Sequence, residues 1–443
     1  MKIEDLKNKN IAILGFGKEG QSSLNFLLNN KITQKNKITI LDANKNIEKK
    51  LSINYILGEK YLDNLEEFDV IIKTSGISSY NEKINKFLDK ITSQTQIFFD
   101  NFDNEKIIAV TATKGKSTTV SLIYEVLKTA GYKVKLVGNI GNPFLDEIEF
   151  SKQKKYDYII CELSSYMLEG LNKTNFISVL GNIYPDHLDY HNGFENYKNA
   201  KLNILKNSKI NIVRDNIKAN FSDISHVVFF GKSSENNFYF DDKNNYYKNK
   251  KLLGQINSNL AGMHNLFNIT SVIAVCDAIG IDFFDIKKGV EKFNSLPHRL
   301  ENIGEFSGII FIDDAISTTP ESTIEAIKTY GENIGTIFLG GKDRGYEYND
   351  LLNLIFEKKI GNLVVFPEIY DKICEILEKN SDKKINLLYT DKMSEAVKFA
   401  YDNTEKGKIC LLSTAAPSYN LWKNFEEKGR EFKKYVIKYS SKK

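Results

Sequence analysis

The chain has 443 residues, of which 42% are hydrophobic, and this is enough apolar material for the cores of about three globular domains. Its 61 basic and 57 acidic residues nearly balance, so the composition gives no sign of nucleic-acid binding and we expect no nucleic-acid partner. No apolar run reaches the length of a membrane span, no signal peptide is recognisable, and the four cysteines are scattered. These features predict a cytoplasmic protein without membrane insertion.

The first predicted block is an α/β unit that binds a nucleotide. Apolar residues at 11–14 predict a strand, and the turn GFGKEG at 15–20 leads from it into a helix. A second strand, at 38–41, ends at Asp42. A G-x-G-x-x-G turn followed by an acid about twenty residues later is the dinucleotide fingerprint, which indicates a site for a nucleotide diphosphate.

The second block carries the most informative motif. An apolar strand at 107–110 is followed by TATKGKST at 111–118 and then by apolar residues at helical spacing. In this arrangement backbone N–H groups and the helix dipole face nucleotide phosphates. Lys116 is predicted to reach the terminal phosphates and the Ser117 hydroxyl to bind Mg²⁺. Ala112 replaces the first glycine of the usual pattern, and a chance Gly-Lys-Ser in a lysine-rich chain is the alternative.

Two later strands of this block end in polar residues. Glu162 follows the strand at 158–161, where a carboxylate would help to hold Mg²⁺, and the alternative is an ordinary acid at a strand end. The segment DHLD at 186–189 follows the strand at 177–180 and offers ligands for a second cation, or is simply a solvated loop. Alternating strands and helices predict a mostly parallel sheet, with a short antiparallel excursion at 231–255.

The third block begins after LPHR at 296–299, and its predicted strands are 309–312, 336–339, 363–366 and 409–412. Thr319 and Pro320 predict a helix start, which is either an anion site or a plain cap. Arg344, in a glycine-rich strand exit, can bind a carboxylate in bidentate fashion. The strands at 309–312, 336–339 and 409–412 are each followed by polar or small residues, which begin near Asp314, Gly340 and Ser413. Three such strand ends on one sheet edge predict a pocket, and so an enzyme that uses ATP to join one substrate to a carboxylate-bearing second.

The order of these motifs resembles the Mur ligase family over essentially the whole chain. The motifs are GFGKEG, VTATKGKST, GNIGNP, ELSS, DHLDYH, KLNIL, GMHNLFN, LPHRLE and IDDAISTTPEST. The resemblance implies an α/β protein of three domains. These are a Rossmann-like UDP-binding domain at 1–100, a central phosphate-loop ATPase-like domain with a mostly parallel sheet at 101–298, and a C-terminal Rossmann-like glutamate-binding domain at 299–443. The ELSS and LPHR forms are similar to those of the glutamate-adding members.

The resemblance implies an ATP-dependent ligase that adds glutamate to UDP-N-acetylmuramoyl-L-alanine through an acyl phosphate in peptidoglycan precursor synthesis. We expect D-glutamate and a monomeric enzyme. Addition of L-glutamate, followed by a separate epimerase, is the alternative, because Met167, Ile316 and Arg344 depart from the family's usual residues near the expected substrate sites. A nicotinamide oxidoreductase and a non-catalytic nucleotide-binding subunit are remote alternatives.

The resemblance also implies a role for each site residue. Lys116, Glu162, His187 and Lys201 would be catalytic, and two Mg²⁺ would be held by Ser117, Glu162, His187 and a carbamylated Lys201. ATP would be bound by Thr113, Lys114, Gly115, Lys116, Ser117, Thr118, Asn265, Asn268, Arg299 and Asp314. The UDP-linked substrate would be bound by Lys18, Glu19, Asp42, Ser75, Gly76, Gly138, Asn139, Ser164 and Ser165. Glutamate would be bound by Thr318, Arg344, Ser418 and Phe425.

Overall fold

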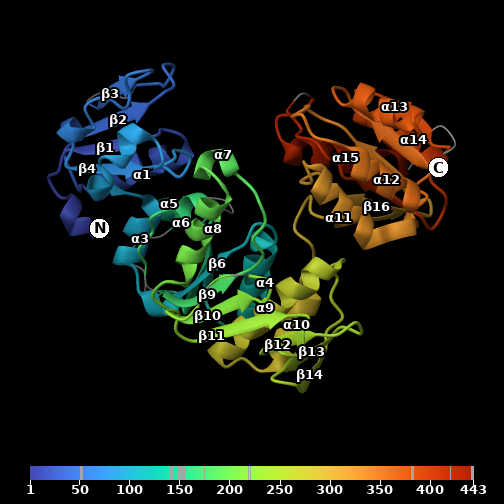
Figure 1. The fold of residues 1–443 in the computed structure, drawn as a ribbon, viewed down its shortest axis with the longest axis horizontal. Coiled ribbons are helices and arrows are strands. Elements are labelled where there is room, and N and C mark those ends of the chain that lie inside the picture. Colours follow the sequence, from blue (N-terminus) through green and yellow to red (C-terminus); the bar gives the residue numbers. More distant parts are fainter. Residues whose placement is uncertain are drawn as a thin grey trace. The chain divides into compact units, whose positions relative to one another are not determined.

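The computed structural model describes residues 1–49, 53–138, 143–147, 155–173, 175–217, 219, 221–380, 384–419 and 421–440 (Figure 1). The chain divides into two compact units. The first comprises Met1–Ser258 and Leu266–Phe293, and the second comprises Asn259–Asn265 and Asn294–Lys443. Among the helices described, none is both long enough and apolar enough to cross a membrane.

The first unit opens with a parallel sheet of five strands in the order β3-β2-β1-β4-β5 (Figure 1). Its strands are β1 (Ile11–Leu14), β2 (Ile38–Asp42), β3 (Asn54–Leu57), β4 (Val70–Lys73) and β5 (Ile91–Thr92), and its helices are α1 (Lys18–Asn29), α2 (Glu82–Asn85) and α3 (Gln94–Asn101). β1 is buried at every position, as expected for a central strand covered on both faces. The order 3-2-1-4 around this strand is that of a Rossmann-like half.

The same unit contains a second sheet of nine strands, in the order β14-β13-β12-β11-β10-β9-β6-β8-β7. The strands are β6 (Ile107–Thr111), β7 (Val134–Gly138), β8 (Tyr158–Glu162), β9 (Asn175–Leu180), β10 (Ser208–Arg214), β11 (Val227–Gly231), β12 (Phe238–Phe240), β13 (Asn245–Lys248) and β14 (Lys251–Gln255). The helices are α4 (Lys116–Thr129), α5 (Phe144–Glu147), α6 (Ser165–Leu168), α7 (Leu188–His191), α8 (Phe194–Leu202), α9 (Met263–Ile279) and α10 (Phe283–Lys292). Among the strands that the structure describes in this sheet, β12–β13 and β13–β14 pair antiparallel and the other pairings are parallel, which confirms the predicted excursion.

The second unit is built on a sheet of six strands in the order β15-β16-β20-β17-β18-β19. The strands are β15 (Glu301–Phe306), β16 (Ile309–Asp313), β17 (Ile334–Leu339), β18 (Asn362–Val365), β19 (Asn386–Tyr389) and β20 (Ile409–Leu412). The helices are α11 (Pro320–Tyr330), α12 (Asn349–Glu357), α13 (Tyr370–Glu378), α14 (Met393–Asn403) and α15 (Phe425–Ser440). Among the described strands of this sheet, β15–β16 pair antiparallel and the other pairings are parallel.

The predicted fold class, mixed α/β with mostly parallel sheets, is confirmed. Each predicted strand is present, whereas the edge strands β3 and β5 and the interior strands β10 and β11 were not predicted from the sequence. The edge strands β15 and β19 were not predicted either. Neither has a continuous buried run, because both lie at sheet edges and alternate between half-buried and exposed positions. The three sheets fall within 1–100, 101–298 and 299–443, and the division into three domains with these bounds stays a prediction.

Candidate active site

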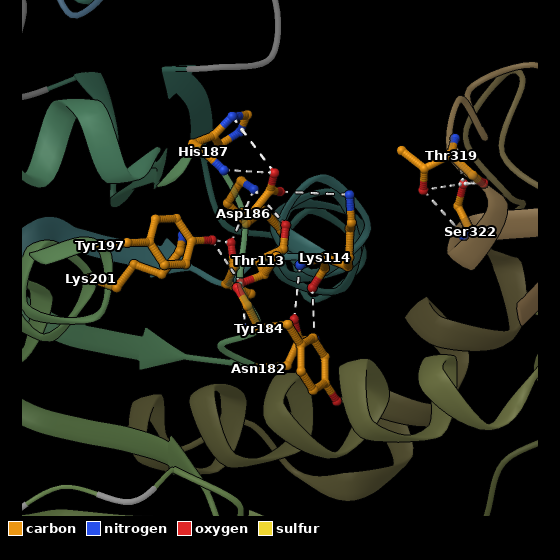
Figure 2. Close-up of polar contacts among 12 residues, drawn as sticks. Thr113, Lys114, Asn182, Tyr184, Asp186, His187, Tyr197, Lys201, Thr319 and Ser322 are labelled. Atoms are coloured by element: carbon orange, nitrogen blue, oxygen red, sulfur yellow. Dashed lines mark hydrogen bonds and ion pairs between the residues drawn. The ribbon is translucent and has the colours of Figure 1, made fainter. Parts of the chain in front are cut away.

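The phosphate loop joins β6 to α4, and Asn182 fixes its backbone (Figure 2). The Lys114 N–H donates to Asn182 Oδ1, and Asn182 Nδ2 donates to the Lys114 carbonyl, both over 2.9 Å. The Thr113 N–H donates to the Asn182 carbonyl over 2.7 Å. One residue just beyond β9 therefore holds the loop at three points, in front of the positive end of the α4 dipole.

Two small residues decide the path of this loop. Gly115 has a φ of 91°, and a Cβ on it would lie 2.7 Å from Asn268 Oδ1, so the position requires glycine. Ala112 is buried and does not have a positive φ. Its methyl group would lie 2.8 Å from a Cβ on Gly181. The departure at Ala112 is therefore accommodated by the missing side chain of Gly181 and not by a strained backbone.

Two lysine side chains meet at the Ala112 carbonyl. Lys116 Nζ donates to this oxygen over 3.1 Å and to the Thr113 carbonyl over 3.2 Å. Lys201, on α8, donates to the same oxygen over 2.9 Å, and its Nζ lies 5.0 Å from the centre of the Tyr197 ring. Lys201 is 1% exposed, and burial together with the charge of Lys116 holds its pKa well below the usual value. A buried amine of lowered pKa is available in its neutral, nucleophilic form.

A carboxylate and a hydroxyl lie together at the start of α4. Glu162 is fully buried at the end of β8, whose register pairs it with Val110 of β6. The Ser117 hydroxyl donates to Glu162 Oε1 over 3.3 Å. Oxygen ligands of this kind suit Mg²⁺, so the donor set fits the metal that the motif predicts.

His187 lies at the N-terminus of α7 with a φ of 52° and a half-exposed side chain. The backbone N–H of His187 donates to Asp186 Oδ1 over 3.0 Å, and Asp186 Oδ2 lies 3.8 Å from Lys114 Nζ (Figure 2). Burial lowers the pKa of His187; Asp186 opposes this effect, and the lysines at the loop add to it. The imidazole is therefore neutral at pH 7, which is the form that binds a metal.

In the first sheet the predicted acids bind backbone groups of the protein. Asp42 Oδ2 accepts the N–H of Phe16 over 2.6 Å, in the glycine-rich turn. Glu19 Oε2 accepts both the N–H and the hydroxyl of Ser75 over 2.8 Å. Lys18, the first residue of α1, and Gly76 are exposed. These residues surround the carboxyl ends of β1, β2 and β4, and their contact with UDP stays a prediction.

The ELSS segment holds two predicted substrate residues. Ser164 Oγ accepts the N–H of Met167 over 3.2 Å and caps α6, so it has a structural role. Ser165 Oγ lies 3.0 Å from His191 Nε2, and both side chains are buried. Burial lowers the pKa of His191 to about 4, so this ring is neutral.

Gly138, which ends β7, has a φ of 104°. A Cβ there would lie 2.3 Å from the Glu162 carbonyl oxygen, so glycine permits the close approach of two strand ends. Asn139 lies outside the described residues. Thr118 is buried within α4.

In the second unit, the four residues predicted to bind glutamate line one cavity of about 240 Å³. They are Thr318, Arg344, Ser418 and Phe425, and the remaining lining residues are Ile316, Pro417 and Tyr419. Two departures from the family pattern, Ile316 and Arg344, thus lie in this cavity. Ser418 Oγ is buried and has no hydrogen-bond partner among the described residues, so it is available to a ligand.

A glycine turn shapes this cavity. Gly341 has a φ of 148°, and a Cβ on it would lie 2.3 Å from the Pro417 carbonyl oxygen. The next N–H, that of Lys342, donates to the same oxygen over 2.7 Å. The close approach holds the turn that bears Arg344 against the segment that bears Ser418.

The remaining predicted ATP ligands are placed as follows. Asp314 accepts the Ser413 hydroxyl over 2.8 Å and the Leu300 N–H over 3.2 Å, and burial raises its pKa to about 6. The charge of Arg299 acts on this carboxyl in the opposite direction. Asn265 Nδ2 donates to the Ala261 carbonyl over 2.7 Å. Asn268 belongs to the first unit, where it accepts from the Thr119 hydroxyl over 3.4 Å.

Thr319 is the N-cap of α11, and Pro320 is the first residue of the helix, as predicted. Thr319 and Ser322 form a reciprocal capping box (Figure 2). The cap explains this pair without a ligand.

Residues that sequence reasoning missed complete the phosphate-loop site. The Tyr197 hydroxyl lies 2.8 Å from Thr113 Oγ1, which also accepts the Tyr184 N–H over 3.0 Å. Tyr197 precedes Lys201 by four residues on α8, so helical spacing was an available signal. Asn182 follows β9 by two residues. Other predicted site residues are also polar residues just beyond the end of a strand, so this position was an available signal for Asn182.

Residues 110–276 match the family model of the Mur ligase middle domain. Two curated proteins named UDP-N-acetylmuramoylalanine–D-glutamate ligase are each 32% identical to the chain. That of Acetivibrio thermocellus matches over 97% of both chains, and that of Caldanaerobacter subterraneus over 98% of this chain and 99% of its own.

Solved structures share the fold at lower identity. The UDP-N-acetylmuramate-alanine ligase MurC of Thermotoga maritima superposes with a TM-score of 0.61 at 20% identity, covering 98% of this chain and 100% of its own. The MurF ligase of the same organism, in complex with ADP, gives 0.58 at 17% identity, with coverage of 99% and 97%.

Proposed function

The chain belongs to the Mur ligase family, and we infer that it is an ATP-dependent ligase that joins D-glutamate to UDP-N-acetylmuramoyl-L-alanine. Similarity over nearly the full length to enzymes named for this reaction is the observation that carries the inference. The reaction belongs to peptidoglycan precursor synthesis. Those names specify D-glutamate, so the L-glutamate alternative is not needed.

The phosphate loop is the proposed site of the ATP triphosphate. The N-terminus of α4 and the ammonium group of Lys116 supply positive charge where the γ-phosphoryl group is transferred. Asn182 and Tyr197 keep the loop in this conformation through their bonds to Lys114 and Thr113.

Two Mg²⁺ ions are part of the proposal. Ser117 and Glu162 would hold the first, and the oxygen donor set described above supports this assignment. His187 and a carbamylated Lys201 would hold the second, and the lowered pKa of each side chain supports it, because both must react or bind as neutral groups. Bound Mg²⁺ would neutralise charge on the phosphates.

The proposed reaction has two steps. The alanyl carboxylate attacks the γ-phosphorus and displaces ADP, and Lys116 offsets the negative charge of the transferring group. The amine of D-glutamate, after loss of a proton, attacks the acyl carbonyl, and phosphate leaves as the amide forms. Arg344 would pair with a carboxylate of D-glutamate, and the buried Ser418 hydroxyl would add a hydrogen bond.

The test is phosphate release from ATP in the presence of Mg²⁺ and UDP-N-acetylmuramoyl-L-alanine, with pure D-glutamate or pure L-glutamate added. Turnover that depends on D-glutamate is the expected result. Turnover with L-glutamate alone would replace the substrate assignment, and no turnover with either would refute glutamate ligation.

A further inference from the structure

We propose that Tyr190 is a positioning residue for the UDP-linked substrate, which it orients by holding the loop Ser75–Ser78 against the segment that carries His187. The proposal rests on the proposed function, in which this loop lies at the UDP end of the substrate and His187 near the reacting end. It concerns a residue that the family resemblance did not assign to the site.

Three hydrogen bonds join Tyr190 to the loop. The Tyr190 hydroxyl lies 2.9 Å from the carbonyl oxygens of both Ser75 and Ile77. In return, the Ser78 hydroxyl donates to the Tyr190 carbonyl over 2.8 Å. These bonds connect residues more than a hundred positions apart in the sequence, so they fix tertiary and not local structure.

The other side of the loop is fixed to the first sheet. Thr74 Oγ1 donates to the Leu14 carbonyl over 3.1 Å, and Ser75 is bound by Glu19 of α1. Lys73 is buried, and its Nζ donates to the Ile77 carbonyl over 2.6 Å. The loop therefore has one set of contacts to the nucleotide fingerprint and another to Tyr190. A shift at either set would displace the residues of the other set.

The ring of Tyr190 is held independently of its hydroxyl. It packs against Tyr166 with a centroid separation of 4.2 Å and an interplanar angle of 60°. Tyr166 follows Ser165 of the ELSS segment and also contacts the rings of His187 and His191, at 5.0 Å and 5.6 Å. Removing the hydroxyl alone therefore leaves this aromatic cluster in place.

The Tyr190 hydroxyl keeps its proton at neutral pH. Burial raises the pKa of Tyr190, and the negative charge of Glu169 and a hydrogen bond to its carboxylate raise it further. The hydroxyl therefore remains a donor to the acceptors around it, which are the Glu169 carboxylate and the two loop carbonyls.

The consequence concerns substrate geometry. Ser75 lies three residues before Ser78, and Tyr190 lies three residues after His187. The three hydrogen bonds between Tyr190 and the loop, here called the clamp, therefore set the spacing between the UDP end and the reacting end of the substrate. A substrate bound at both ends loses affinity or alignment if this spacing is free to vary, because reactive alignment depends on fixed positions.

The test compares Tyr190→Phe, Ser78→Ala and the control Tyr80→Phe, which changes an exposed tyrosine two residues beyond Ser78. Steady-state KM is measured for UDP-N-acetylmuramoyl-L-alanine, ATP and D-glutamate, and binding of the UDP-linked substrate alone is measured by calorimetry. Tyr190→Phe is expected to raise KM and Kd for the UDP-linked substrate roughly three- to tenfold, as for one lost hydrogen bond, and to leave KM for ATP and D-glutamate within about twofold. Ser78→Ala should act in the same direction, and Tyr80→Phe should have no effect.

Two results would overturn the positioning role. One is wild-type parameters in both Tyr190→Phe and Ser78→Ala. The other is an equal change in all three KM values with a lower melting temperature, which would indicate a purely structural role. An inactive wild-type enzyme would instead refute the proposed function, and the calorimetric binding of the UDP-linked substrate would still test the clamp.

Discussion

Substitution of Asn182 with alanine should weaken ATP binding, although Asn182 is not one of the residues assigned to ATP by the family resemblance. The change removes the two side-chain hydrogen bonds that hold the backbone N–H and the carbonyl of Lys114, and it leaves the backbone bond to Thr113. The loop would then sample conformations in which its N–H groups no longer converge on the phosphates. ATP binding would then have to order the loop again, and the free energy needed for this would lower the affinity for ATP.

The magnitude follows from the two bonds. Each contributes about 0.5–1.5 kcal/mol, and partial exposure of Asn182 places them in the lower half of this range. Their sum of about 1–2 kcal/mol corresponds to roughly a 5- to 30-fold rise in KM for ATP. The melting temperature should fall by only a few degrees, because no apolar contact is lost.

The assay is phosphate release as a function of ATP concentration, together with calorimetric binding of ADP. Asn196→Ala is the matched control, since Asn196 is a partly buried residue of α8 that makes one hydrogen bond to the Asn192 carbonyl. An Asn182→Ala enzyme that is folded and keeps a KM for ATP within twofold of the wild type would refute the argument that Asn182 orders the loop.

Three further predictions follow. Lys201→Ala and Lys201→Arg should each lower kcat roughly 100-fold, as measured by phosphate release, because neither side chain can carry a carbamate; full activity in either would remove Lys201 from the metal site. In urea titrations, the free energy of unfolding should fall as the pH drops from about 6.5 towards 4, by at most about 1.4 kcal/mol per pH unit from His191, whose pKa of about 4 lies below that of the unfolded chain. The unfolded state binds a proton that the folded state excludes, so His191→Gln should lose this component, and an unchanged slope would contradict the assignment. Gly341→Ala should destabilise the protein by about 1–3 kcal/mol and raise KM for D-glutamate, whereas Gly361→Ala, with open space and no positive φ, should do neither.

The parts of the fold that could be predicted from the sequence are those with strong local signals. Buried parallel strands such as β6 read as continuous apolar runs, and the Thr319–Pro320 helix start is a local cap. Edge strands such as β15 lack such a run, because one side of each is open to solvent.

The contacts of the candidate site likewise include some that the sequence predicts and some that it does not. Lys116 and Ser117 are adjacent in one motif, so their proximity follows from the sequence. The contacts of Asn182 with Lys114 and of Tyr190 with Ser75 span 68 and 115 positions. Pairings of that kind depend on strand order and register, which a single sequence does not reveal.

The contact between Ala112 and Gly181 also constrains the order in which the two positions can change during evolution. An alanine at 181 would bring two Cβ atoms to 2.8 Å while Ala112 is present, and one of the two backbone segments would have to move. A glycine at 112 would first remove the methyl group, after which a larger residue at 181 has room. The two sites are therefore epistatic: the same substitution at 181 is harmful in one background and acceptable in the other. A lineage that carries alanine in the phosphate loop can thus restore the glycine directly, but it can enlarge residue 181 only by that route.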